Sequence, residues 1–293
     1  MAESKKLLLA RQRGFCGGVR AALTELEKLL DGHPDSPVCV LHELVHNRHV
    51  TSMFTERGVR FLNDLVELPG GAVLLLGAHG VSPDTERRAR KLAKLVVDTT
   101  CPLVKARQRE AAKLASGDTL ILLGHPRHPE VVGIVGWSGA GTNVVVSSAA
   151  EAEQVEVPSR PVLLTQTTFD AFELARCRGI LERRFPDLEF RGGVCRASLE
   201  RQECVEKLAR RVEVVVVAGS PHSSNARRLC ETAERCGARG VLAEGAAELP
   251  RELFELRRVG LTAGASTPDA DVDGMLAAFS AAGFDIEKQP QEG

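Results

Sequence analysis

Residues 13–19 read Arg-Gly-Phe-Cys-Gly-Gly-Val and place Cys16 among glycines. The stretch follows the short apolar run Leu7–Ala10 and comes directly before a segment with helix-like spacing of apolar residues. Because glycines free the backbone and carry no bulk, a cysteine between them can hold a group that packs close to the chain. We interpret the rest of the chain as the scaffold for this cysteine and for two others.

Cys101 and Cys195 have a comparable setting. Cys101 ends the strand-like stretch 96–101 and is followed by proline, and Cys195 ends a Gly-Gly-Val-Cys stretch. Any single cysteine can instead be a small buried apolar residue. We assign that role to the cysteines inside strand-like or helical patterns, which are Cys39, Cys177, Cys204, Cys230 and Cys236. No Cys-x-x-Cys pair is present, and we expect no disulfide framework.

Strand-like apolar runs alternate with amphipathic helical segments along the chain. The predicted strands are 7–10, 38–42, 73–76, 96–97, 119–123, 144–147, 162–165, 212–217, 240–242 and 259–261. The predicted helices are 21–30, 84–95, 103–114, 129–136, 170–184, 197–211, 225–236 and 268–282. Continuous apolar strands are typical of parallel sheets covered by helices, so we predict an α/β fold. The spacing predicts three α/β units, 1–97, 98–192 and 193–293, with a frayed polar tail at 287–293.

The composition is ordinary for a folded protein. Of 293 residues, 43% are hydrophobic and 26% are charged, and the formal net charge is -1. A chain so close to neutral is not expected to be a general binder of nucleic acid or membrane surfaces. No apolar run approaches the ~18 residues of a membrane span, and the apolar run after residues 1–6 is too short for a signal peptide. We therefore expect a cytoplasmic protein without nucleic-acid or membrane partners.

Polar side chains follow the predicted strands, where open α/β sheets bind their ligands. They include His46, His79, His128, Glu130, Thr167, Ser223, Ser224, Asn225 and Ser266. Each alone could be a hydrogen-bonded core residue or a helix cap. As a set, neutral donors and imidazoles suit a small buried site for a multiply charged anion such as a diphosphate. Glu130 directly follows a His-Pro step and is the natural proton donor.

The three glycine- or proline-flanked cysteines suggest a metal centre. Three thiolates without a nearby fourth suit a 4Fe-4S cluster whose open iron can take a substrate oxygen. Zinc held by three cysteines and a histidine is the competing interpretation. The wide sequence separation and the glycine-flanked loops favour the larger cluster.

These motifs resemble those of the LytB/IspH family of hydroxymethylbutenyl diphosphate reductases. The similar segments run in order along nearly the whole chain. They are Arg13–Val19, Val45–Arg48, Ala78–Ser82, Asp98–Val104, Gly124-His125, His128–Val131, Thr165–Thr168, Cys195 with Arg201-Gln202, Ser223–Asn225 and Thr262–Ser266.

The resemblance implies the last reaction of the non-mevalonate isoprenoid pathway. In it, 4-hydroxy-3-methylbut-2-enyl diphosphate, an allylic diphosphate, is reduced to isopentenyl and dimethylallyl diphosphate. Cys16, Cys101 and Cys195 would hold one 4Fe-4S cluster, and its open iron would take the substrate hydroxyl. Glu130 would donate protons. The diphosphate and its surroundings would be held by His46, His79, His128, Thr167, Ser223, Ser224, Asn225 and Ser266. The implied fold places three α/β units in pseudo-threefold fashion around the cluster.

The loop around the third cysteine departs from the family pattern. The family usually has an Asp and a Thr or Ile just before this cysteine, where the chain has Gly192-Gly193-Val194. After it the family tends to read Tyr-Ala-Thr and then Asn before Arg-Gln, where the chain has Arg196, Ser198 and Glu200. These departures bear on substrate or partner preference and leave the three ligands unchanged.

Two other functions stay open on the sequence. A non-catalytic iron–sulfur paralogue would be expected to lack Glu130 or the anion-binding residues, and both are present. A zinc-dependent hydrolase acting on a diphosphate would contain zinc without iron or sulfide. For the reductase, a ferredoxin or flavodoxin is the expected electron donor, because no Gly-x-Gly-x-x-Gly fingerprint follows a strand.

Overall fold

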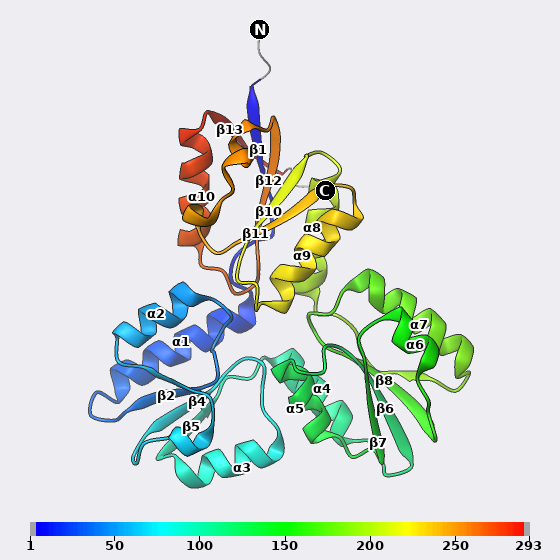
Figure 1. Cartoon of the computed structure of the whole chain (residues 1–293). Coiled ribbons are helices and arrows are strands. Elements are labelled where there is room, and N and C mark those ends of the chain that lie inside the picture. Colours follow the sequence, from blue (N-terminus) through cyan, green and yellow to red (C-terminus); the bar gives the residue numbers. More distant parts are fainter. Residues whose placement is uncertain (1–3, 290–293) are drawn as a thin grey trace. The chain divides into compact units, whose positions relative to one another are not determined.

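The computed structural model describes residues 4–289, which form three small parallel sheets (Figure 1). The outermost residues, 1–3 and 290–293, lie outside the described range. The expectations for the N-terminal segment (no signal peptide) and for the polar tail (frayed) therefore fall partly outside the described range. Among the described helices, none has the length and apolarity needed to cross a bilayer.

The first sheet has the strand order β3-β2-β4-β5. Its strands are β2 (Val38–Leu41), β3 (Arg60–Leu62), β4 (Val73–Leu76) and β5 (Leu95–Asp98). The accompanying helices are α1 (Gly17–Gly32), α2 (Arg48–Glu56), the 3-10 turn η1 (Leu65–Glu67) and α3 (Pro83–Leu92). Leu74 and Leu76 of the central β4 pack toward Ala89 of α3, so this helix closes one face.

The second sheet has the order β7-β6-β8-β9. Its strands are β6 (Asp118–Leu123), β7 (Thr142–Val146), β8 (Arg160–Thr165) and β9 (Glu189–Phe190). The helices are α4 (Pro102–Ala112), α5 (Pro129–Trp137), α6 (Ala149–Gln154) and α7 (Ala171–Arg184). Ile121 and Leu163 face α6 and α7, whereas Leu122 and Leu164 face α4 and α5. The central strands are therefore apolar on both faces, as parallel strands covered by helices must be.

The third sheet has the order β11-β10-β12-β1-β13. Its strands are β1 (Lys5–Leu9), β10 (Val214–Ala218), β11 (Arg239–Ala243), β12 (Arg258–Ala263) and β13 (Phe284–Lys288). The helices are α8 (Arg196–Ala209), α9 (Ser224–Arg235) and α10 (Asp269–Ala281), with the 3-10 turns η2 (Ala246–Glu248) and η3 (Arg251–Glu255). Leu7 and Leu9 pack with α10, and Leu8 packs with α8 and α9 on the other face.

The chain divides into two compact units. One, the five-stranded unit, holds the residues up to Gly17, His46–Ser52 and the chain from Arg196 onward; the other, the two-sheet unit, holds Gly18–Val45 and Met53–Cys195. The predicted α/β fold with parallel sheets is confirmed. The division at residues 97 and 192 and the arrangement around a cluster stay predictions.

The expectation that the polar tail frays is wrong for residues 287–289. Glu287 and Lys288 pair with β1, and the Gln289 N–H donates to the Leu9 carbonyl at 2.9 Å. A polar sequence is compatible with this position because β13 is an edge strand with a solvated face.

Candidate functional site

The three candidate cysteines are anchored in the same way. Each backbone N–H donates to the loop that follows a neighbouring strand. The acceptors are the carbonyls of Ala265 for Cys16 (3.1 Å), Ala78 for Cys101 (3.0 Å) and Thr167 for Cys195 (2.8 Å). The strand pairs concerned are β1–β12, β5–β4 and β9–β8. Each acceptor loop contains or adjoins a candidate binding residue, namely Ser266, His79 or Thr167.

Each of these cysteines also comes directly before a helix. Helix α1 begins at Gly17, α4 at Pro102 and α8 at Arg196. The unpaired amides and the positive end of the helix dipole at such positions favour negative charge. Within residues 4–289 none of the three thiols is part of a disulfide, and each is half-buried. Thiolates in positive, partly accessible surroundings are the donors that iron–sulfur clusters use, so the residues present fit that cofactor.

The cysteines inside regular elements are in different surroundings. Cys39 in β2 and Cys177 in α7 are fully buried. Burial raises the pKa of Cys177 and of Cys230 to about 12, and it also raises the pKa of Cys39. These thiols stay protonated at neutral pH and are poor metal ligands.

Glu130 and Thr167 form a buried pair in the two-sheet unit. Glu130 lies in the first turn of α5 and is 1% exposed. The Thr167 N–H donates to its Oε1 at 2.6 Å, and the Thr167 hydroxyl donates to its Oε2 at 2.9 Å. Burial raises the pKa of Glu130 to about 7, although the Thr167 hydrogen bonds and the Arg107 charge oppose the rise. Glu130 can therefore hold a proton near neutral pH and release it, as a proton donor must.

The raised pKa of Glu130 predicts a pH-dependent stability. Below pH 4.5 the carboxyl is neutral in both the folded and the unfolded chain, and this contribution to stability is complete. Between pH 4.5 and about 7 the unfolded chain loses the proton first, so the free energy of unfolding falls as pH rises, and it levels off above pH 7. At 1.36 kcal/mol per pKa unit the loss is about 3 kcal/mol.

Urea unfolding of the wild type and of Glu130→Gln across this pH range measures that contribution. Glutamine does not titrate, so the stability difference between the two proteins should change by this amount between pH 4.5 and 7. Parallel stability curves would contradict the buried, proton-holding state of Glu130.

His128 caps the helix that carries Glu130. Its Nδ1 accepts a hydrogen bond from the Glu130 N–H at 3.2 Å at the N-cap of α5. The ring of His79 lies 5.2 Å from the ring of His128, nearly perpendicular to it. Four candidate residues of the two-sheet unit thus belong to one neighbourhood, which we call the acid set: His79, His128, Glu130 and Thr167.

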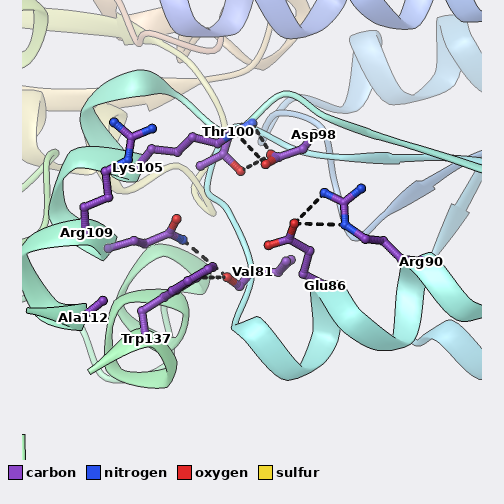
Figure 2. A pocket seen from close by; sticks show the side chains of 10 residues that line it. Val81, Glu86, Arg90, Asp98, Thr100, Lys105, Arg109, Ala112 and Trp137 are labelled. Carbon is purple, nitrogen blue, oxygen red and sulfur yellow. Dashed lines mark hydrogen bonds and ion pairs between the residues drawn. The ribbon is translucent and has the colours of Figure 1, made fainter. Parts of the chain in front are cut away.

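The loop after His79 is held by α4 and α5. The Val81 carbonyl accepts from Trp137 Nε1 at 2.9 Å and from Gln108 Nε2 at 3.4 Å (Figure 2). Gly80 has φ +71°, and a Cβ there would lie 2.5 Å from Gln108 Nε2. Only glycine fits both the backbone conformation and the close approach.

A cavity of about 300 Å³ opens beside this loop. Five of its lining side chains are charged, and four of them pair among themselves, Lys105 with Asp98 and Arg90 with Glu86, both at 2.6 Å. Its charges are thus largely neutralised internally, and none of the candidate site residues lines it.

Serine hydroxyls gather at the start of α9 in the five-stranded unit. Ser223 is the N-cap, and its Oγ accepts from the Ala226 N–H at 3.3 Å. The Ser266 hydroxyl lies 3.4 Å from the Ser223 hydroxyl and 3.3 Å from the carbonyl oxygen of His46. Ser224 is the first residue of the helix and is buried. Hydroxyls at a helix N-terminus are suited to binding an anion.

Asn225 adds a buried donor to this neighbourhood. Its Oδ1 accepts from the Ala265 N–H at 2.8 Å, while its buried Nδ2 has no hydrogen-bond partner among residues 4–289. A buried amide donor without an acceptor is costly, so the side chain is prepared for an oxygen of a ligand. We call Ser223, Ser224, Asn225, Ser266 and His46 the anion set.

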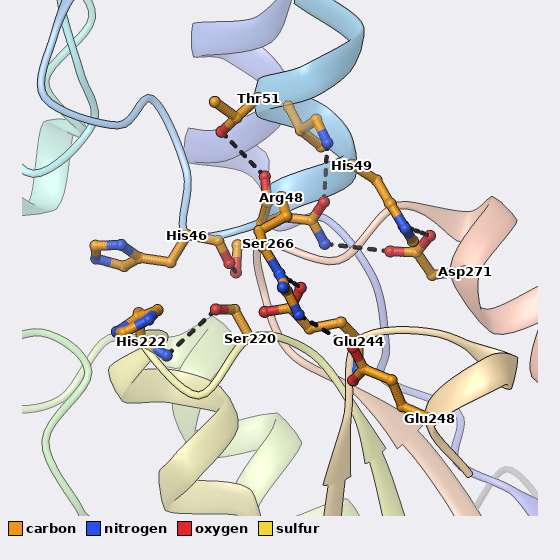
Figure 3. A network of polar contacts seen from close by, with 12 residues as sticks. His46, Arg48, His49, Thr51, Ser220, His222, Glu244, Glu248, Ser266 and Asp271 are labelled. Atoms are coloured by element: carbon orange, nitrogen blue, oxygen red, sulfur yellow. Dashed lines mark hydrogen bonds and ion pairs between the residues drawn. The ribbon is translucent and has the colours of Figure 1, made fainter. Parts of the chain in front are cut away.

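A network of polar contacts, buried at Asn47, Asp271 and Glu244, holds the segment that carries His46 (Figure 3). Asp271 in α10 accepts from Asn47 Nδ2 at 3.2 Å, and its other oxygen lies 2.6 Å from His49 Nδ1. Asn47 in turn accepts the Val50 N–H at 2.9 Å through its Oδ1. Arg48 pairs with the buried Glu244 and with Glu248. The turn 46–49 is thereby fixed to helix α10 and to the segment that follows β11.

Replacing Asp271 by alanine is expected to lower the free energy of unfolding by about 1–3 kcal/mol, because Asn47 loses its buried acceptor. Urea unfolding measures the change. The matched control is Asp273→Ala, an exposed position in the same helix, which should stay within about 0.5 kcal/mol of wild type. Equal stability of the two variants would mean that Asp271 does not hold the turn.

Some supporting residues carry no distinctive sequence signal. Asp271 lies in the first turn of a helix, where acidic residues are common, and nothing nearby in sequence indicates its contact with Asn47. Arg201 was noted only as part of a motif. It is buried and donates from Nη2 to the Gly14 carbonyl at 2.6 Å, so it holds the loop before Cys16.

Known proteins resemble this chain over nearly its whole length. The family model described as LytB protein matches residues 7–280. A 4-hydroxy-3-methylbut-2-enyl diphosphate reductase of Desulfotalea psychrophila is 40% identical over 94% of the chain and 90% of its own length. One from Saccharophagus degradans is 37% identical, covering 98% of the chain and 96% of the relative.

Solved structures agree with the sequence comparisons. The structure of the E-1-hydroxy-2-methyl-but-2-enyl-4-diphosphate reductase from Plasmodium falciparum matches with a TM-score of 0.88 and 28% identity, over 99% of this chain and 94% of that one. A second, described as the terminal enzyme of the non-mevalonate pathway, matches with a TM-score of 0.65 and 30% identity over 94% of this chain and 99% of that one. The chain therefore belongs to the LytB protein family.

Proposed function

We propose that this chain is a 4-hydroxy-3-methylbut-2-enyl diphosphate reductase of the non-mevalonate isoprenoid pathway. The main observation is that Cys16, Cys101 and Cys195 share one structural setting. Each is half-buried, comes directly before a helix, and donates its backbone N–H to the loop that follows a neighbouring strand. Family membership and relatives of the same name support the same activity. The buried Glu130–Thr167 pair supplies the acid that such a reaction requires.

Cys16, Cys101 and Cys195 would hold one 4Fe-4S cluster with three protein ligands. When bound, such a cluster supplies single electrons and Lewis acidity at an open iron. Among the remaining cysteines, Cys39, Cys177 and Cys204 are buried. Cys230 and Cys236 are half-buried but lie in α9 and at its C-terminal end, so they do not share the setting of the three candidate ligands.

The anion set would bind the diphosphate. Its donors are hydroxyls, the unpartnered Asn225 amide and the first amides of α9, all of which suit phosphate oxygens. Because these groups carry no net charge, they recognise the anion through directed hydrogen bonds. A diphosphate held this way fixes the position of the attached five-carbon chain. His46, His79, His128 and Thr167 would complete the surroundings of the substrate.

Glu130 would protonate the departing hydroxyl group. Replacing a carbon-bound hydroxyl by hydrogen consumes two electrons and two protons and releases one water. One proton goes to the leaving oxygen, and the other goes to carbon. With a pKa of about 7, Glu130 is half protonated near neutral pH, and the Thr167 hydrogen bonds stabilise the carboxylate that remains after transfer.

The two electrons would come from a small one-electron carrier of the ferredoxin or flavodoxin type. No strand in the described range is followed by a glycine-rich dinucleotide fingerprint, which supports a protein donor over a nicotinamide cofactor.

The test is anaerobic purification followed by iron and sulfide analysis and an assay with the substrate and a chemically reduced carrier. The expected result is about four irons per chain, with isopentenyl and dimethylallyl diphosphate as products. Zinc without iron or sulfide would overturn the proposal in favour of a metal-dependent hydrolase. An iron-loaded chain without turnover would favour a non-catalytic relative.

A further inference from the structure

Arg107 lies in α4 and contacts the glycine pair that precedes Cys195. Its Nη2 donates to the Gly193 carbonyl at 3.1 Å. Gly192 has φ +140°, and a Cβ built there would lie 2.2 Å from the Arg107 guanidinium carbon. The guanidinium therefore occupies the space that any side chain at position 192 would need.

The neighbouring glycine is different. A Cβ on Gly193 would meet Leu174 and Phe190 at 3.5 Å, which is ordinary van der Waals distance. Gly193 is tied to Arg107 only through its backbone carbonyl, which any other residue at this position would also offer. Position 192 thus requires glycine on two grounds, its φ of +140° and the guanidinium that lies where a Cβ would be, whereas position 193 has neither constraint.

The glycine pair leads directly to two site residues. Two positions after Gly193, the Cys195 N–H donates to the Thr167 carbonyl at 2.8 Å, and Thr167 holds both oxygens of Glu130. The Arg107 charge also acts on Glu130 and lowers its pKa against the larger effect of burial. The other groups that face this carboxyl are Thr167 and, next to its backbone N–H, His128.

One nitrogen of the Arg107 side chain has no hydrogen bond within residues 4–289. Its Nε is buried and has no hydrogen-bond partner in the part of the chain that the structure describes. Arg107 as a whole is half-buried, so only its Nε loses hydration without a compensating hydrogen bond, a cost that the use of its charge and shape can offset. The shape of the Arg107 guanidinium is used at the Gly192-Gly193 loop, and its charge acts on Glu130.

We infer, resting on the proposed function, that Arg107 is a positioning residue: its guanidinium fixes the loop that presents Cys195 and places a positive charge toward Glu130. The fork-shaped group serves the loop, and the charge serves the acid. Lysine separates the two roles, since it keeps the positive charge without the fork, whereas glutamine lacks both.

The first measurement is hydrogen exchange of the backbone amides of 191–195 on the chain without cofactor. Exchange of the Cys195 amide should be about tenfold faster in Arg107→Gln, Arg107→Lys and Gly192→Ala than in wild type. Gly193→Ala is the matched control and should exchange like wild type. If all four variants exchange like wild type, or if Gly193→Ala loosens the loop as much as Gly192→Ala, Arg107 does not position the loop.

The second measurement is the pH profile of turnover, together with the rate of iron release to a chelator. Arg107→Gln should move the alkaline limb of kcat/KM upward by up to about one pH unit, because an opposite charge that favours the carboxylate is gone. Arg107→Lys should leave that limb in place, and both should release iron faster than wild type. An unshifted limb in Arg107→Gln would overturn the role toward Glu130.

Failure of the proposed function would look different. Amide exchange on the cofactor-free chain requires neither cluster nor substrate. If Arg107→Gln and Gly192→Ala exchange faster than wild type but the wild-type chain binds no iron, the reductase is refuted and the loop contact stands. Wild-type exchange in Arg107→Gln and Gly192→Ala, in a chain that turns over substrate, would refute the positioning role alone.

Discussion

Replacing Glu130 by glutamine is expected to lower kcat/KM for the allylic diphosphate by about 10²–10⁴-fold. Glutamine keeps the size of the side chain, and its Oε1 can still accept the Thr167 N–H, which lies 2.6 Å from the glutamate oxygen. What is lost is the dissociable proton of a carboxyl whose pKa burial raises to about 7. The remaining turnover should lose the alkaline limb near that pH, because no group at this position titrates any longer.

The measurement is turnover under anaerobic conditions at a fixed concentration of reduced carrier, across pH 5.5–9. Glu153→Gln provides the control, since Glu153 is an exposed residue of α6 and should leave rate and profile unchanged. Iron content must be equal in all three proteins. A Glu130→Gln variant that works near the wild-type rate, with its alkaline limb intact, would remove Glu130 from proton transfer.

Replacing Cys101 by serine is expected to abolish turnover and to remove most of the bound iron. A hydroxyl is far less acidic than a thiol and does not replace a thiolate ligand to iron. The fold should survive, because the anchoring bond at this position runs from the backbone N–H to the Ala78 carbonyl and does not involve the side chain. Cys16→Ser and Cys195→Ser should behave alike for the same reason.

Iron and sulfide per chain, with circular dichroism as a check of folding, measure the effect. The control is Cys236→Ser, because Cys236 is also half-buried but lies at the C-terminal end of α9, away from the strand ends. It should retain iron and activity. Full iron content in any one of the three serine variants would show that the cysteine concerned is not a ligand.

The central strands could be predicted from sequence because their apolar runs are continuous. In β2, β4 and β6 every residue is buried, so the pattern is unmistakable. Strands β3, β9 and β13 were not predicted, and each lies at the edge of its sheet. Edge position alone does not explain this, because the edge strands β5, β7 and β11 were predicted. Strands β3 and β9 have only 3 and 2 residues, and β13 is largely polar, so none of the three contains a continuous apolar run.

Pairing between distant segments was beyond the sequence pattern. The run Leu7–Ala10 predicts a strand, but nothing in it identifies β12 and β13 as its neighbours. Helix α2 was also missed, since its residues follow a histidine-rich loop motif and include β-branched Val50 and Thr51. A motif that marks chemistry can thus conceal the regular element it begins.

The candidate site could be predicted more completely than its supports. Strand ends, glycines and helix starts indicate Cys101, Glu130 and Ser223 because the chemistry of each is concentrated in a few adjacent residues. The residues that hold neighbouring loops, such as Asp271 at Asn47 and Arg107 at Gly193, contact them from ordinary helical positions. Their partners are distant in sequence, and a single sequence carries no record of such contacts.

The position of β1 between β12 and β13 has a consequence for biosynthesis. β1 leaves the ribosome early, yet its two neighbours exist only after residues 258–288 have been translated. The sheets spanning 38–98 and 118–190 have all their strands close together and can form on the nascent chain. Cys16 follows β1 and bonds the loop after β12, so it is the last of the three cysteines to reach its native setting. Assembly machinery that inserts a cofactor here would therefore have to act after β12 and β13 have been synthesised.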